Sequence, residues 1–151
     1  MNPSFRPARG RSYIAFYKPF EVLCQFSEEK ESGEEKKTTL AAFDFPASVY
    51  PVGRLDYDSE GLLLLSDDGR MTRELFEGRE HPRTYLVQVE RVPEAAQLLQ
   101  LEKGVLLQGV KTRPAKVKLL TDEPQIEERC KPIRFRKNVP TAWLELTLWE
   151  G

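Results

Sequence analysis

Residues 53–69 read Gly53-Arg54-Leu55-Asp56-Tyr57-Asp58-Ser59-Glu60-Gly61-Leu62-Leu63-Leu64-Leu65-Ser66-Asp67-Asp68-Gly69. The carboxylate of Asp56 stands in a short segment between two glycines, and the chain then enters an apolar run. A run that is apolar on both faces predicts a buried strand over 62–65. The acidic pair and glycine that follow are typical of a turn, and a helix over 71–76 is expected after it. The stretch therefore predicts one acid held on a tight loop beside a core.

The rest of the chain reads mainly as strands. We expect strands over 13–17, 49–52, 83–90, 105–107, 115–120 and 143–149, and helices over 38–43 and 93–101. Pro93 suits the first turn of the second helix and Gly104 suits its exit. Because no strict strand–helix–strand rhythm appears, the sequence predicts an α+β fold with a mostly antiparallel or mixed sheet and short helices.

Composition limits the class of protein. The chain has 151 residues, of which 31% are charged and 40% hydrophobic, so one folded domain is expected. Its apolar runs are far shorter than a membrane span, and no signal peptide is evident, so a cytoplasmic location is the default. Two cysteines and one histidine imply no disulfide framework and no zinc site. We expect both cysteines to be reduced.

The near-neutral net charge of −1 hides an uneven distribution. Residues 129–137 carry five cations and no acid: Arg129, Lys131, Arg134, Arg136 and Lys137. This stretch is either a solvated loop or a surface that attracts nucleic acid. Residues 1–12 are expected to be a basic N-terminal arm, and the main domain is expected over 13–151.

Asp56 taken alone supports several readings. An aspartate between glycines can simply form an Asx turn. Asp56, Asp58 and Glu60 also have the spacing of a calcium loop, but the apolar run begins where further ligands should come. A paired-carboxylate hydrolase using Asp56 with Asp58 or Glu60 is a further possibility, although no second acid lies in a comparable loop.

The whole stretch is more specific than its aspartate. It resembles the catalytic signature of the pseudouridine synthases that modify ribosomal RNA. Two further motifs support the resemblance: Tyr17-Lys18-Pro19 before 22–26, and Arg83-Thr84-Tyr85 at a strand, where the family has Lys for Arg83. Residues 132–134 and 143–151 bring the chain closest to the ribosomal large subunit pseudouridine synthase E group.

This resemblance implies a reaction and its residues. A specific uridine of large-subunit ribosomal RNA would be flipped into a pocket and isomerised to pseudouridine without cofactor or metal. Asp56 would be the catalytic carboxylate, acting as nucleophile or through a glycal intermediate, in a mostly apolar pocket. Tyr85 would stack on the uracil and is a candidate base for the C5 proton.

RNA contacts are implied for five cations: Arg54, Lys18, Arg134, Arg136 and Lys137. Each has a plainer alternative, since Arg54 can be a surface ion-pair partner, Lys18 a solvated loop lysine and the others part of a solvated loop. Tyr85 can likewise be an ordinary strand aromatic.

The family pattern continues past Glu150-Gly151 with a Gln-Val-Arg-Arg motif whose arginine pairs with the catalytic aspartate. We therefore expect this chain to be incomplete at its C-terminal end, which puts its own activity in question. A non-catalytic RNA-binding fragment is the alternative function. The complete protein is expected to be a monomer that binds ribosomal RNA and no membrane.

Overall fold

The computed structural model describes residues 10–27, 36–76, 81–127, 131–132 and 137–150. The chain divides into two compact units. The N-terminal unit comprises Met1–Arg79 with Arg129–Lys131, and the C-terminal unit comprises Glu80–Glu128 with Pro132–Gly151. Both combine antiparallel strands with one short α-helix, which confirms the predicted α+β class. The boundary predicted between an arm and a domain at residue 12 stays a prediction.

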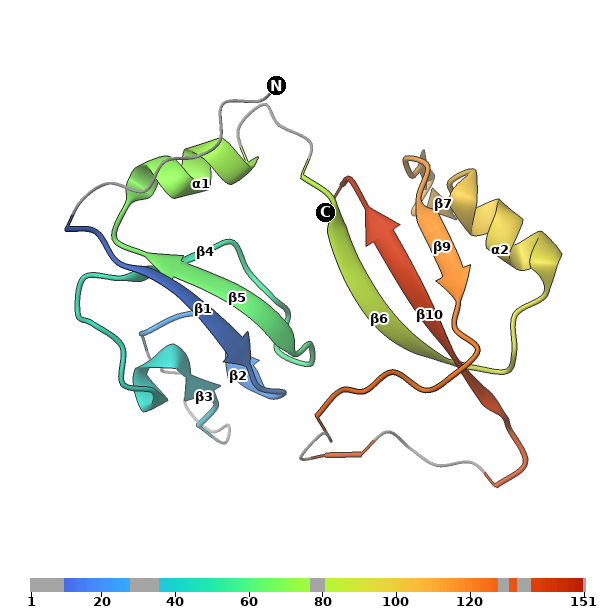
Figure 1. The fold of residues 1–151 in the computed structure, drawn as a ribbon, viewed down its shortest axis with the longest axis horizontal. Coiled ribbons are helices and arrows are strands. Elements are labelled where there is room, and N and C mark those ends of the chain that lie inside the picture. The colour runs from blue at the N-terminus through green and yellow to red at the C-terminus, as the bar shows by residue number, and fades with distance from the viewer. Residues whose placement is uncertain (1–9, 28–35, 77–80, 128–130, 133–136, 151) are drawn as a thin grey trace. The chain divides into compact units, whose positions relative to one another are not determined.

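The N-terminal unit is built on three antiparallel strands in the order β1-β5-β4, comprising β1 (Tyr13–Lys18), β5 (Gly61–Ser66) and β4 (Tyr50–Val52) (Figure 1). Leu63 lies opposite Phe16 across the β1–β5 pairing, and Leu65 lies opposite Ile14. Leu63 and Leu65 are buried, but Leu62 is 67% exposed. The expectation of a strand buried on both faces is therefore wrong. The pleat of β5 turns alternate leucines into the core.

Aromatic rings complete this core. Five buried aliphatic side chains form its centre: Val22, Leu40, Val49, Leu63 and Leu65. The ring of Phe16 meets those of Phe43 and Phe45 edge-on, with centroids 4.9 and 5.0 Å apart. Edge-to-face rings at this spacing are favourable beyond the area that they bury.

The N-terminal unit also contains two short strands, a 3-10 turn and an α-helix. Strands β2 (Val22–Leu23) and β3 (Thr38–Thr39) pair in parallel, which the sequence did not predict. The expected helix near 38–43 is a 3-10 turn, η1 (Leu40–Ala42), and Oγ1 of Thr39 accepts a hydrogen bond from N of Ala41 at its start. Helix α1 (Gly69–Phe76) follows β5 directly.

The C-terminal unit is a second three-stranded antiparallel sheet in the order β6-β10-β9, formed by β6 (Arg83–Glu90), β10 (Thr141–Leu148) and β9 (Lys116–Leu119). Helix α2 (Ala95–Glu102) lies beside β9 (Figure 1). A hairpin of β7 (Leu106–Leu107) and β8 (Val110–Lys111) follows it.

The boundaries of α2 differ slightly from expectation. Its N-cap is Glu94, so Pro93 precedes the helix instead of lying in its first turn. Glu94 and Gln97 form a capping box, in which N of Glu94 donates to Oε1 of Gln97 at 2.9 Å. Gly104 follows the C-cap residue with a φ of +85°, as its predicted exit role requires.

Candidate active site

The loop between β4 and β5 alternates exposed and half-buried side chains. Arg54 and Asp56 are exposed, whereas Leu55 between them packs against the core of the N-terminal unit. Gly53 starts the loop with a φ of +90°, a conformation that L-residues rarely adopt. Within the part of the chain that the structure describes, neither the Arg54 nor the Asp56 side chain joins an ion pair or hydrogen bond. The Asp56 side chain is exposed among the described residues, and the apolar pocket expected around its carboxylate stays a prediction.

Backbone contacts fix the loop around Asp56. The carbonyl of Asp56 accepts a hydrogen bond from N of Ser59 at 3.1 Å, which closes a turn. The carbonyl of Tyr57 accepts another from N of Glu21 at 2.8 Å. The thiol of Cys24 lies against Leu55, with Sγ 3.2 Å from its N and 3.3 Å from its O. Residues 21–24 therefore hold the loop from the side of β2.

The buried side chain of Lys18 supports residues 21–24, which contact the Asp56 loop. Its side chain is fully buried, and Nζ donates to the carbonyls of Pro19 at 2.9 Å and Val22 at 2.8 Å. Burial lowers the pKa of Lys18, although the Cys24 thiol and nearby carboxylates, Asp58 foremost, act in the opposite direction. The ammonium is turned toward carbonyls in this conformation, so the structure gives its predicted phosphate contact no support.

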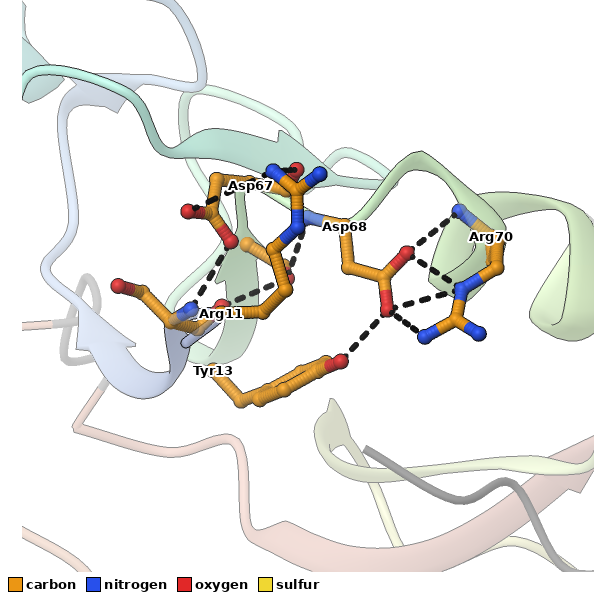
Figure 2. A network of polar contacts seen from close by, with 7 residues as sticks. Arg11, Tyr13, Asp67, Asp68 and Arg70 are labelled. Atoms are coloured by element: carbon orange, nitrogen blue, oxygen red, sulfur yellow. Dashed lines mark hydrogen bonds and ion pairs between the residues drawn. The ribbon is translucent and has the colours of Figure 1, made fainter. Parts of the chain in front are cut away.

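The far end of the signature forms a polar network that joins β1, β5 and α1 (Figure 2). The carboxylate of Asp68 accepts hydrogen bonds from the hydroxyl of Tyr13 at 2.6 Å and from Nη2 of Arg70 at 2.6 Å. It also accepts one from N of Arg70 at 3.1 Å, at the start of α1. The side-chain hydrogen bond from Arg70, then that from Tyr13, holds the pKa of Asp68 well below its usual range.

Two further hydrogen bonds join the segment before β1 to residues 66–67 at the end of β5. N of Ser12 donates to Oδ1 of Asp67 at 2.9 Å, and Oγ of Ser66 donates to the carbonyl of Ser12 at 2.7 Å. Arg11 lies at the edge of this network, where Nη1 donates to the carbonyl of Asp67 at 3.3 Å (Figure 2). Both ends of β5 are therefore fixed, one by the loop of Asp56 and the other by this network.

The remaining predicted site residues belong to the C-terminal unit or are not described. Tyr85 lies on β6 opposite Leu146 of β10 and is 38% exposed. Lys137 is exposed in a turn before β10. Arg134 and Arg136 lie outside the described residues. Lys18, Arg54 and Asp56 thus belong to the N-terminal unit, and the contribution of Tyr85 to the same site as Asp56 stays a prediction.

Within residues 10–27, 36–76, 81–127, 131–132 and 137–150, no group of three or more His, Cys, Asp or Glu side chains is placed to hold a metal ion. Within the same ranges, neither α-helix has the length and apolar character needed to cross a membrane. Cys24 is a free, half-buried thiol as expected, and Cys130 lies outside the described residues.

Comparison with known proteins places these features in context. The sequence profile of a family described as RNA pseudouridylate synthase matches residues 12–151. The chain is 50% identical over 139 residues to the ribosomal large subunit pseudouridine synthase E of Xanthomonas axonopodis pv. citri, covering 91% of this chain and 72% of that protein. It is 46% identical to the protein of the same name from Vibrio vulnificus, covering 93% of this chain and 58% of the relative.

A solved structure agrees with the sequence matches. The fold is similar to a crystal structure of a pseudouridylate synthase, with a TM-score of 0.67 and 27% identity. The similarity covers 93% of this chain and 52% of the other.

Proposed function

The chain belongs to the RNA pseudouridylate synthase family, a family of isomerases, and on that premise we propose that it converts a uridine of large-subunit ribosomal RNA to pseudouridine. The observation that carries the proposal is the exposed Asp56 carboxylate on a loop whose neighbouring residue, Leu55, packs into the core. Such a loop holds a reactive group in place and leaves it open to a macromolecular substrate.

The proposed reaction breaks the N1–C1′ bond of uridine and forms a C5–C1′ bond, with loss of the C5 proton and gain of a proton at N1. Asp56 is the proposed catalytic residue, either as nucleophile at C1′ or by assisting a glycal intermediate. Tyr85 is proposed to stack on the flipped base and to take part in removal of the C5 proton. Base flipping is required because the reacting atoms are inaccessible in stacked RNA.

Cations are proposed to contact the RNA backbone. Arg54 is exposed two residues before Asp56, which suits a contact beside the reacting nucleotide. Lys137 is exposed in its turn, and we propose it together with Arg134 and Arg136 as a source of sequence-independent affinity. The E-type relatives make large-subunit RNA the proposed substrate and the cytoplasm the proposed location.

The test is tritium release from ribosomal RNA labelled at uracil C5. We would assay the chain, a form extended by the C-terminal segment that the family pattern predicts, and the Asp56→Asn variant of each. Release that is lost with Asp56→Asn would support the proposal. The matched control is Asp58→Asn, which changes an exposed acid two residues along the same loop and is expected to retain release.

Other outcomes separate the alternatives. Salt-dependent RNA binding without release from any form would favour a non-catalytic RNA-binding role. Liberation of free uracil that depends on both Asp56 and Asp58 would favour hydrolysis and would contradict the isomerase proposal.

A further inference from the structure

We propose that Cys24 is a positioning residue whose thiol sets the peptide plane leading into Asp56. This inference rests on the proposed role of Asp56 in catalysis. Cys24 and Leu55 are 31 residues apart in sequence, and the fold brings the thiol of one against the backbone of the other. The contact is thus a product of tertiary structure at the residue that precedes the proposed catalytic acid.

The contact is reciprocal. N of Leu55 donates to Sγ of Cys24 at 3.2 Å, and Sγ donates to O of Leu55 at 3.3 Å. A thiol carries one weak donor and a weak acceptor, so this single side chain satisfies both polar groups of one residue. A packed hydrophobic side chain at position 24 would fill the space without satisfying either group.

The carbonyl of Leu55 belongs to the peptide bond that leads to Asp56. Because a peptide unit is planar, fixing the oxygen of Leu55 also fixes the direction in which Cα of Asp56 leaves it. The next two carbonyls are held by backbone donors, O of Asp56 by Ser59 and O of Tyr57 by Glu21. Of these three contacts, only the one from Cys24 is made by a side chain, so a point mutation can remove it alone.

The surroundings of Cys24 favour this role. Its side chain packs against the buried core cluster, which limits the positions that Sγ can take. It follows the segment braced by the buried ammonium of Lys18, so the thiol approaches the loop from a supported element. Loss of the contact should therefore affect the Asp56 loop more than the core beneath it.

The test compares Cys24→Ala, Cys24→Ser and Val49→Ala in the same protein. Val49 is 1% exposed in the same core, so its truncation destabilises the unit without touching the loop contact. We expect Cys24→Ala to reduce the single-turnover rate on RNA about tenfold through misplacement of the carboxylate. RNA affinity should be unchanged, and Cys24→Ser should retain more activity because a hydroxyl can also donate and accept.

Amide hydrogen exchange at Leu55 gives a readout independent of turnover. We expect the Leu55 amide to exchange faster in Cys24→Ala than in the wild type, and at an intermediate rate in Cys24→Ser. In Val49→Ala, the amides of the loop should keep the same ranking of exchange rates as in the wild type. Unchanged exchange, an unchanged rate in Cys24→Ala, or an equal loss of rate in Val49→Ala and Cys24→Ala would overturn the positioning role. A wild-type protein that binds RNA without turnover would overturn the proposed function instead, and the exchange data would still decide the thiol contact.

Discussion

Gly53→Ala tests how the loop of Asp56 is built. Gly53 leaves β4 with a φ of +90°, and a Cβ at this position would lie 2.8 Å from Cζ of Phe76, the last residue of α1. Carbon atoms that are not bonded do not approach so closely, so the ring must move. The substitution thus combines backbone strain with overpacking at the residue that begins the loop.

The expected loss of stability follows from three contributions. A left-handed backbone disfavours an L-residue by roughly 1–2 kcal/mol. Overpacking adds about 1 kcal/mol, at the low end of its range, because the clash is with the tip of the Phe76 ring, which is 47% exposed. Replacing glycine also reduces the entropy of the unfolded chain, which offsets about 0.4–1 kcal/mol. We therefore expect Gly53→Ala to lower the free energy of unfolding by about 1–3 kcal/mol. At an m-value of about 2 kcal/mol/M, the urea midpoint should fall by about 1 M.

The assay is urea unfolding followed by circular dichroism. Gly69→Ala is the matched control, because Gly69 begins α1 and a Cβ there would meet nothing within 4 Å. Its midpoint should stay unchanged or rise, since alanine favours helix. In a Phe76→Leu background, which removes the ring tip, Gly53→Ala should lose less stability than in the wild type. A Gly53→Ala midpoint equal to that of Gly69→Ala would refute the reasoning.

Three further expectations concern the supports of each unit. A Cβ at Gly104 would clash with the Thr112 carbonyl, whereas a Cβ at Gly109, which has a similar φ, would meet nothing. Urea unfolding should therefore find Gly104→Ala less stable than Gly109→Ala by about 1–3 kcal/mol. Because the pKa of Asp68 is depressed, its contribution to stability is present above about pH 4 and lost as the pH falls further. Wild type should therefore lose more stability than Asp68→Asn between about pH 5 and 2 in acid titrations of the urea midpoint. Lys18→Met should lower the free energy of unfolding by about 1–3 kcal/mol by leaving two carbonyls unsatisfied. The salt dependence of RNA affinity should stay unchanged, and a slope reduced by about one would instead support a phosphate contact.

Local patterns predicted the elements whose causes are local. The strand expected over 143–149 and the helix exit at Gly104 each depend on residues a few positions apart, and both were found, as β10 and at the end of α2. The two-residue parallel pairing of β2 with β3 has no such signal, because it depends on how the core brings distant segments together. The exposure of Leu62 was missed for a similar reason, since composition alone does not say which face of a strand is covered.

At the candidate site too, features that depend on nearby residues were predicted, and features that depend on distant residues were not. The sequence predicted the tight loop that carries Asp56, because glycines and turn formers act within a few residues, whereas the catalytic role of Asp56 stays a proposal. It gave Lys18 either a phosphate contact or a place in a solvated loop, since lysine is usually exposed. Its burial depends on two carbonyls that converge only in the folded chain. Cys24 carried no local signal at all, because its partner is distant in sequence.

The residues beside Asp56 hold its loop in place while the Asp56 side chain stays exposed. A side chain that meets a large substrate must be open to solvent, yet an open loop usually lacks the contacts that hold a group in place. Here Leu55 packs into the core, while Asp56 itself remains exposed. Backbone carbonyls on both sides of Asp56 are bound by Cys24 and Glu21. The loop therefore gains its order from groups that the substrate need not touch, so variants at those groups should change the rate of reaction more than the affinity for RNA.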